Sequence, residues 1–316
     1  MVRRRIVMLA LPILAAPVLA GCAGMGRERP EPPVTTALRF AAALEAADPA
    51  VDAAVARMDG FERMAAREDS AIGFAVGGRA APPSRFTAAP AGAAEAAGRV
   101  LSPAFTALSD YAHLLDQVAE GERIQGKPGP TGQQLAAAVA NGLDAVQAAT
   151  GTPVPEPVRG AGLAGITALS DMPETMTRGG ARPTLAGMVA AGQPHLQAVA
   201  ALLRTVIGPE IGQGTRGTIR ARREALDAQQ SRFLAALRGD GRIGAGERYS
   251  IFRSVAELRD SDPAQGTFAA LLDLLAAIEA AHAALAVDGP DAEAKVAALE
   301  AAVARVSVTT EGSRRG

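Results

Sequence analysis

The sequence predicts an all-α protein, an antiparallel bundle of roughly seven to ten helices that follows a flexible N-terminal tether. Alanine is the dominant hydrophobic residue, and alanine has the highest helix propensity and lets helices approach closely. Aromatic residues make up only 3% of the 316 residues and Trp is absent, whereas strands favour aromatic and β-branched side chains. The chain also lacks a convincing alternation of apolar and polar residues, which a half-buried strand would show.

Apolar residues recur at helical spacing in the N-terminal half of the chain. A first helical stretch is predicted over residues 35–72, with a break at Asp48-Pro49, because Asp caps helices and Pro begins them. Two antiparallel helices and one kinked helix both fit this pattern. Residues 77–92 form a loop, and the next helix carries the buried stripe Leu101, Phe105, Leu108, Ala112 and Leu115. Thr131 is predicted to cap the helix with the stripe Leu135, Val139, Leu143 and Val146.

Glycine and proline interrupt the second half of the chain more often. Residues 158–180 are apolar but broken by glycine, and one alternative divides the all-helical domain, residues 34–308, near 151–183. Pro183 is expected to begin a helix, and Pro209 with its neighbouring glycines to kink or interrupt it. Further helices are predicted over 218–238 and 249–258, after Pro263, and around 296–306. Residues 309–316 are expected to be a disordered tail.

The first 21 residues have the layout of a secretory signal peptide. Arg3, Arg4 and Arg5 form a positive segment ahead of an apolar run from Ile6 to Ala20. This run is too short for a comfortable membrane span, which needs roughly 20 residues. It is followed by the tetrapeptide Leu19-Ala20-Gly21-Cys22, which resembles the lipobox of bacterial lipoproteins.

The resemblance implies that the thiol of Cys22 receives a diacylglycerol and that a peptidase cuts before this residue. Residues 22–33 would then form a lipidated tether, held to the membrane by about 0.8 kcal/mol for each buried methylene. The alternative is an ordinary cleaved signal peptide with an incidental cysteine. In lipoproteins like those of enterobacteria, a residue other than Asp after the cysteine, here Ala23, favours the outer membrane, facing the periplasm.

Charge and cysteine content exclude several classes of function. The net charge is −1, and without residues 1–21 the chain has 29 basic against 33 acidic residues, so bulk binding to nucleic acid is not expected. The single cysteine excludes an internal disulfide framework and a cysteine-cluster metal site. Neither a metal nor a cofactor is predicted, because His113, His195 and His282 lack the spacing of metal ligands.

Catalytic and nucleotide-binding motifs give no indication of an enzyme. Residues 160–165 match GxGxxG, but dinucleotide binding needs a preceding strand, so close helix packing or a loop is favoured. The sequence contains neither a GxSxG nucleophile motif nor a phosphate-binding P-loop. We therefore expect a protein without enzymatic activity.

The most suggestive surface feature is an arginine stripe at helical spacing. Arg216, Arg220 and Arg223 lie on one helix face, and guanidinium groups pair well with carboxylates and phosphates. Envelope proteins, peptidoglycan stem peptides and lipid headgroups carry such groups. The alternative is a solvated face whose arginines pair with Glu210, Glu224 or Asp227.

These observations predict a lipid-anchored helical protein of the cell envelope that acts as a scaffold or binds a partner. One alternative is a carrier that holds an apolar ligand in a groove around residues 158–217. Another is an envelope hydrolase whose catalytic residues follow no familiar motif.

Overall fold

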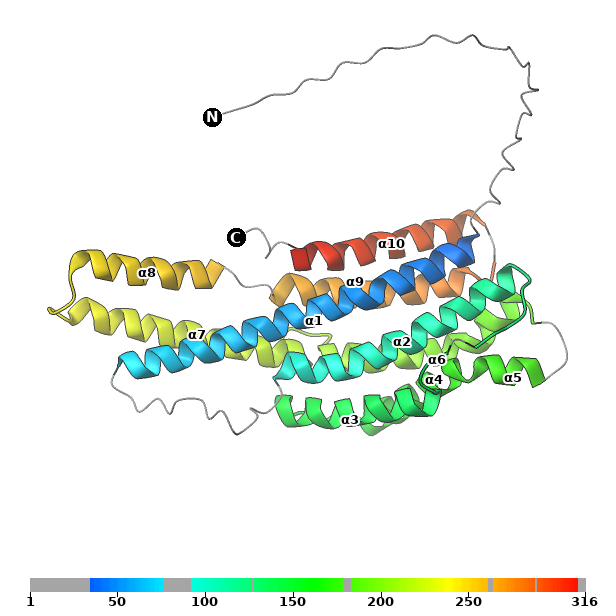
Figure 1. The fold of residues 1–316 in the computed structure, drawn as a ribbon, viewed down its shortest axis with the longest axis horizontal. Coiled ribbons are helices and arrows are strands. Elements are labelled where there is room, and N and C mark those ends of the chain that lie inside the picture. The colour runs from blue at the N-terminus through cyan, green and yellow to red at the C-terminus, as the bar shows by residue number, and fades with distance from the viewer. Residues whose placement is uncertain are drawn as a thin grey trace, which may run out of the picture. The chain divides into compact units, whose positions relative to one another are not determined.

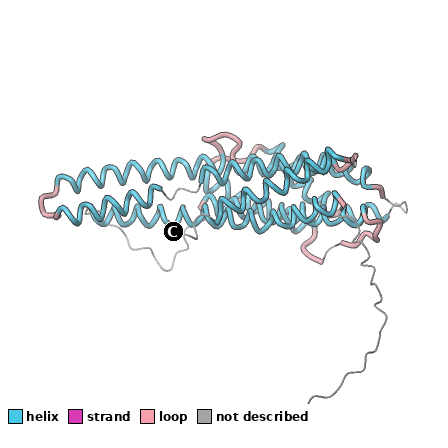
Figure 2. Tube along the Cα trace, turned by 90° about the horizontal axis from the view of Figure 1, so that it is seen from above, coloured by secondary structure: helices cyan, strands magenta, loops and turns pink. Residues whose placement is uncertain are grey.

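The structure, a computed structural model, describes residues 35–76, 92–126, 128–178, 183–260, 264–287 and 289–311, and these form helices and loops only. The predicted all-α class is therefore confirmed (Figures 1 and 2). Cys22 and the signal peptide lie outside the described residues. Residues 34–316 make one compact unit. Its helices are α1 (Thr36–Ala75), α2 (Ala93–Ala119), α3 (Gly132–Thr150), α4 (Glu156–Ser170), α5 (Met172–Arg178), α6 (Leu185–Ile207), α7 (Gly214–Gly239), α8 (Ala245–Asp260), α9 (Ala264–Ala284) and α10 (Pro290–Glu311).

The longest helix, α1, decides between the two alternatives at Asp48-Pro49 in favour of one helix. It runs for 40 residues with Pro49 in its interior. A proline inside a helix removes one backbone hydrogen bond and costs about 3 kcal/mol. Ala47, Ala50 and Val51 are buried on both sides of the proline, so a continuous apolar face offsets that cost.

Helix ends follow the sequence signals most closely where threonine precedes the helix. The Thr131 hydroxyl accepts a hydrogen bond from the backbone N–H of Gln134 at 3.2 Å, and the Gln134 side-chain oxygen accepts from the N–H of Thr131 at 2.9 Å. This reciprocal capping box confirms the predicted cap. Helix α6 is capped by Thr184, one residue after the expected Pro183, and it ends before Pro209 as predicted.

The last helix extends further than the sequence suggests. Residues 309–311 belong to α10, whereas a disordered tail was expected to begin at 309. The hydroxyls of Thr309 and Thr310 donate to carbonyls one turn earlier, at 2.7 and 2.6 Å. Arg57 of α1 also donates to the Thr309 carbonyl. These bonds satisfy polar groups that the end of a helix otherwise leaves to water.

The core is centred on α2, which contacts α1, α3, α4 and α6. The apolar stripe predicted for this helix is buried over its full length, from Leu101 to Leu115. On the other side, α1 packs against α9 and α10. Helix α9 is the one described helix that is long and apolar enough to cross a membrane, over Gly266–Ala284. Half of that window is buried inside the bundle, as in a core helix.

The glycines of the GxGxxG segment lie in α4 and bring it close to α6. A Cβ atom at Gly162 would lie 2.6 Å from Cδ2 of Leu202, and one at Gly165 would lie 2.8 Å from the carbonyl oxygen of His195. The segment therefore serves close helix packing, the alternative to nucleotide binding. At these two glycines α4 and α6 pack closely, which leaves no groove between them there.

A polar network is buried in the core where α2, α6 and α9 meet. Nδ1 of His282 lies 2.6 Å from Oε1 of Gln193, and Nε2 lies 2.8 Å from the hydroxyl of Tyr111. Because an amide oxygen can only accept, Nδ1 carries the proton and Nε2 accepts from Tyr111. The same hydroxyl lies 3.2 Å from the Met188 carbonyl oxygen. Gly192 makes room for it, since a Cβ there would lie 2.1 Å away.

Burial keeps this network uncharged. It lowers the pKa of His282 to about 4 and raises the pKa of Tyr111 well above its usual value. At neutral pH the imidazole and the phenol are therefore both neutral. A network whose polar atoms are satisfied in this way ties three helices together without burying a charge.

The neutral imidazole predicts a loss of stability on acidification. In the unfolded chain His282 takes up a proton near pH 6.5, whereas in the folded protein it does so near pH 4. The unfolded state thus binds more protons between these values, and the free energy of unfolding rises with pH across that window. Between pH 7 and pH 5 we expect a loss of about 2 kcal/mol in urea unfolding followed by circular dichroism. The His282→Gln variant should lose that part of the pH dependence, and an unchanged profile would contradict the assignment.

Close packing of α4 predicts opposite effects for two neighbouring glycines. Gly162→Ala should destabilise the protein by about 1–3 kcal/mol, because the new methyl overlaps Leu202. Gly160→Ala is the matched control in the same helix, where a Cβ meets no atom within 4 Å. It should stabilise the protein by up to about 1 kcal/mol through helix propensity. Thermal denaturation of both variants checks the order, and the reverse order would argue against close packing.

Candidate binding surface

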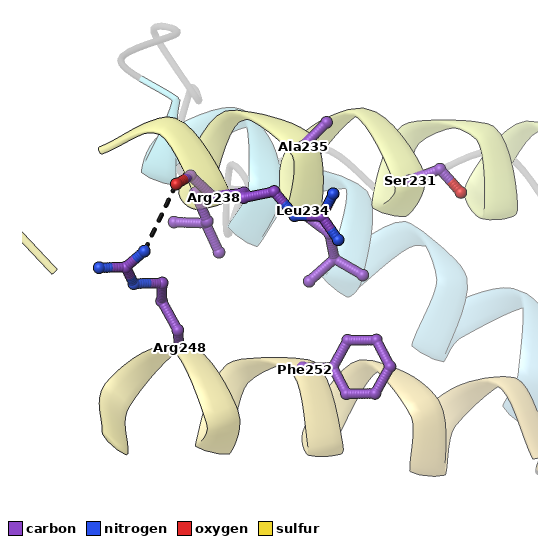
Figure 3. Close-up of a pocket in the computed structure, with 7 residues that line it drawn as sticks. Ser231, Leu234, Ala235, Arg238, Arg248 and Phe252 are labelled. Atoms are coloured by element: carbon purple, nitrogen blue, oxygen red, sulfur yellow. Dashed lines mark hydrogen bonds between the residues drawn. The ribbon is translucent and has the colours of Figure 1, made fainter. Parts of the chain in front are cut away.

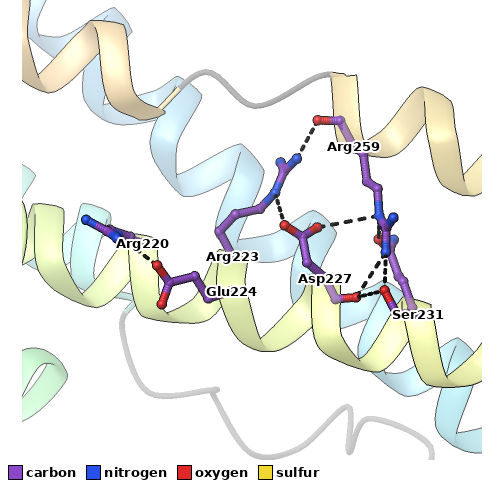
Figure 4. Close-up of polar contacts among 7 residues, drawn as sticks. Arg220, Arg223, Glu224, Asp227, Ser231 and Arg259 are labelled. Carbon is purple, nitrogen blue, oxygen red and sulfur yellow. Dashed lines mark hydrogen bonds and ion pairs between the residues drawn. The ribbon is translucent and has the colours of Figure 1, made fainter.

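The predicted arginine stripe lies on α7 and is partly engaged with its own helix (Figure 4). Arg220 is 2.8 Å from Glu224, and both side chains are largely exposed. An exposed pair one turn apart contributes only about 0.3–0.5 kcal/mol, so a stronger acidic group can displace it. Arg216, in the first turn of α7, is half-buried and makes no ion pair with a described residue.

Arg223, the third member of the stripe, points into the contact between helices. Its guanidinium lies 5.9 Å from the ring centroid of Phe61 in α1, and Nε lies 3.3 Å from the Asp227 carboxylate. It also donates to the carbonyl of Arg259 in the last turn of α8. Arg223 therefore joins α1, α7 and α8, and the exposed part of the stripe consists of Arg220 with Arg216 beside it.

Arg222, which the sequence does not single out, joins two helices through a buried carboxylate. Its guanidinium lies 2.8 Å from Oε1 of Glu62, a carboxylate of α1 that is 2% exposed. The same carboxylate accepts the backbone N–H groups of Ala93 at 3.2 Å and Ala94 at 2.8 Å. Gly92 leaves room for it, because a Cβ there would lie 2.5 Å from Oε2. Glu62 thus caps α2 from a distant helix and holds α7 at the same point.

A cavity of about 490 Å³ lies beside Glu62. The acidic and basic side chains around it compensate one another. Asp59 pairs with Arg63 one turn away, and Glu95 lies 2.6 Å from Arg99. With Glu62 bound to Arg222, the acidic groups around the cavity have basic partners. We therefore assign these charged groups a structural role at the contact of α1, α2 and α7 around Glu62, which we term the joint.

A second clamp fixes the base of the hairpin that α7 and α8 form (Figure 4). Arg259 Nε lies 3.1 Å from the side-chain oxygen of Gln230, and its terminal nitrogen donates to the Ser231 hydroxyl at 2.8 Å and to the Asp227 carbonyl at 3.0 Å. Gln230 is itself buried and reaches Glu68 of α1 at 3.4 Å. The base of the hairpin is therefore tied to α1 through the partly buried contact of Gln230 with Glu68.

Beyond this clamp the hairpin is loosely packed and leaves apolar side chains uncovered. Of the α8 side chains that the structure describes, only Val255 is buried. A cavity of about 440 Å³ opens between α7 and α8, and Leu234 and Phe252 point into it from opposite sides (Figure 3). The turn itself is well defined, since Arg248 donates twice to the Ile243 carbonyl, at 3.1 and 2.8 Å.

Helix α1 ends beside this free part of the hairpin. The pairs Glu62–Arg222 and Asp69–Gln229 both join residues 160 apart in sequence, so α1 and α7 run parallel. Continuing this register brings Phe74 level with about residue 234 of α7, and Figure 1 shows the end of α1 beside α7. Phe74 therefore lies at the same end of the bundle as the free part of the hairpin.

The aromatic side chains divide sharply between the core and this end. Phe40, Phe61, Phe105, Tyr111 and Phe268 are buried. The three exposed aromatic residues of the described chain are Phe74, Tyr249 and Phe252, with exposed fractions of 77%, 67% and 59%. Together with the half-buried Phe233, they form what we term the aromatic end. The exposed rings thus lie at one end of the bundle, which makes this end a candidate binding surface.

No family model matches the chain, and no curated protein or solved structure matches it either. The chemistry of the side chains is thus the basis for assigning a function. Among the described residues, no three His, Cys, Asp or Glu side chains come together as metal ligands. His113 contacts Gln117 at 3.1 Å and His282 belongs to the buried network.

The contacts of Glu62 predict that its removal lowers the free energy of unfolding much more than removal of the exposed Glu257. Glu62→Ala should lower the free energy of unfolding by about 2–3 kcal/mol, because α2 loses its cap and Arg222 loses its buried partner. Glu257→Ala is the control, since that residue forms an exposed pair with Arg253 at 2.8 Å. It should change stability by less than about 0.5 kcal/mol. Urea unfolding of both variants measures the difference, and equal effects would exclude Glu62 as the joint.

Proposed function

We propose that the protein is a lipid-anchored, non-enzymatic protein of the cell envelope that binds its partner through the aromatic end. The observation that carries the binding role is the gathering of Phe74, Tyr249 and Phe252 at one end of a bundle whose other described aromatic rings, apart from the half-buried Phe233, are in the core. Exposed aromatic side chains dominate many binding surfaces because they bury a large area at low entropic cost. Arg216 and Arg220 lie near the start of α7, about 20 Å or more along the helix from the aromatic end, and would offer a separate positive surface to an acidic group on the partner.

The attachment in this proposal is supported by the N-terminal sequence. The signal-like segment and the lipobox-like tetrapeptide ending at Cys22 would fasten the mature protein to a membrane facing the periplasm, with the outer membrane favoured by Ala23. The partner is then a component of the envelope, a protein, the peptidoglycan or the bilayer itself. Nucleic acid is not proposed, because the chain carries a net charge of −1.

A carrier of an apolar ligand is the second candidate, and one specific observation favours it. The cavity of about 440 Å³ between α7 and α8 is lined in part by Leu234, Leu237 and Phe252. Its size falls in the range of small-molecule sites. A carrier would therefore use this cavity rather than the closely packed contact of α4 with α6.

The anchor predicts that Cys22→Ser abolishes incorporation of a fatty-acid analogue and moves the protein from the membrane to the water-extractable fraction. Two or three acyl chains account for stable attachment, so removing the acceptor thiol should remove it almost completely. Labelling and cell fractionation of both chains provide the measurement. Ala23→Ser serves as control and should label as the unchanged chain does. Undiminished labelling of Cys22→Ser would overturn the anchor.

A further inference from the structure

We infer that the occupant of the aromatic end is the surface of an anionic phospholipid bilayer, with the aromatic rings in the interface and arginines against the phosphates. The inference rests on the proposed function in taking this end as the binding surface. It adds the chemical class of the partner. Three properties of the described residues support it: the kind of exposed side chain, the charge around it and the way these side chains are distributed over the helices.

The exposed side chains are those that favour the boundary between water and lipid. Tyr249 has an apolar ring and a polar hydroxyl, and Phe74 and Phe252 expose more than half of their surface. Aromatic rings are enriched at this boundary, and arginine stems lie on apolar surface while their charged heads stay in water. In water the same rings remain uncovered, so binding to a bilayer removes apolar area from solvent.

The charge of the hairpin complements an anionic surface. Residues 228–256 contain five arginines and two acids, although the whole chain carries a net charge of −1. Arg232 donates to the Ala228 carbonyl at 3.4 Å and Arg248 to the Ile243 carbonyl at 2.8 Å, so these bonds leave their positive charge uncompensated. Arg253 pairs with Glu257 in an exposed contact. Each basic residue near an anionic leaflet contributes about 1 kcal/mol.

The distribution of the aromatic residues favours a bilayer over other partners. Phe74 comes from the end of α1, whereas Tyr249 and Phe252 come from the N-terminal half of α8. Exposed rings contributed by two helices, with Phe252 beside the cavity between α7 and α8, suit a broad interface. A second copy of this chain would bring the same excess of arginine against itself, which is unfavourable.

Lipid binding at this end would work together with the acyl chains at Cys22. A single acyl chain gives marginal membrane binding, and stable attachment takes a second signal such as further chains or a basic patch. Once the acyl chains hold the protein at the membrane, the aromatic end is also at a high effective concentration near the lipid headgroups. The hairpin would thus orient the bundle against the membrane in addition to strengthening its attachment.

The absence of tryptophan from the chain allows a local test. Phe252→Trp, placed in the full chain with Cys22→Ser, gives one fluorescent reporter at the aromatic end. We expect its emission to shift to the blue with phosphatidylglycerol vesicles, to be quenched by brominated phosphatidylglycerol, and to change little with phosphatidylcholine vesicles. High salt should reverse the shift, because it screens the attraction between arginine and phosphate.

The matched control is Val287→Trp in the same chain, at an exposed residue between α9 and α10. The emission of Val287→Trp should neither shift nor be quenched. This control distinguishes contact at the aromatic end from adsorption of another part of the chain to the vesicle. Adding Arg238→Gln and Arg242→Gln to the Phe252→Trp chain should weaken vesicle affinity about tenfold or more. Thermal denaturation should show these chains equally folded.

Several results would overturn the inference. One is an unchanged emission of Phe252→Trp with both kinds of vesicle, and another is an equal response at Val287→Trp. A shift with polyglutamate or DNA but not with vesicles would assign the aromatic end to a different class of partner. Each of these results can occur while Cys22 is still labelled by fatty acid, so failure of lipid binding here is separable from failure of the anchor.

Discussion

The buried carboxylate of Glu62 is the contact on which the arrangement of this bundle depends. It lies on α1, accepts the first free N–H groups of α2 and binds the guanidinium of Arg222 on α7. A carboxylate that is 2% exposed is costly to bury without partners, and here helix N–H groups and an arginine compensate the charge. Three helices from distant parts of the chain are thereby held in one register.

That register accounts for the location of the aromatic end. With Glu62 facing Arg222, α1 and α7 run parallel, and Phe74 comes to the same end as the turn between α7 and α8. The neutral network of Tyr111, Gln193 and His282 stabilises the other part of the core, where α2, α6 and α9 meet. One end of the molecule therefore buries its rings, and the other exposes its rings to solvent.

Local patterns in the sequence predicted the local features of the fold. The stripe on α2 and the cap at Thr131 depend on residues three or four apart, and both follow directly from helix geometry. Local patterns left open whether one helix or two pass Pro49, and one helix forms because burial on both sides of the proline outweighs its local cost. Glu62 and Arg222 were missed because they are 160 residues apart, and no local spacing indicates a contact at that distance. From sequence alone, Tyr249 and Phe252 resemble core residues of a short helix. In the structure both side chains are exposed to solvent.

Distances between spin labels on α1 and α7 test the central claim about register most directly. In the full chain with Cys22→Ser, labels at Phe74→Cys and Ala235→Cys should give a single short distance, because packed helix axes lie about 8–10 Å apart. Position 221 lies fourteen helical residues, about 20 Å of axial rise, before position 235, so labels at Phe74→Cys and Ala221→Cys should be clearly further apart, by roughly 14 Å. Glu62→Ala should broaden both distributions. A shorter distance to position 221 than to 235, or no response to Glu62→Ala, would contradict the account.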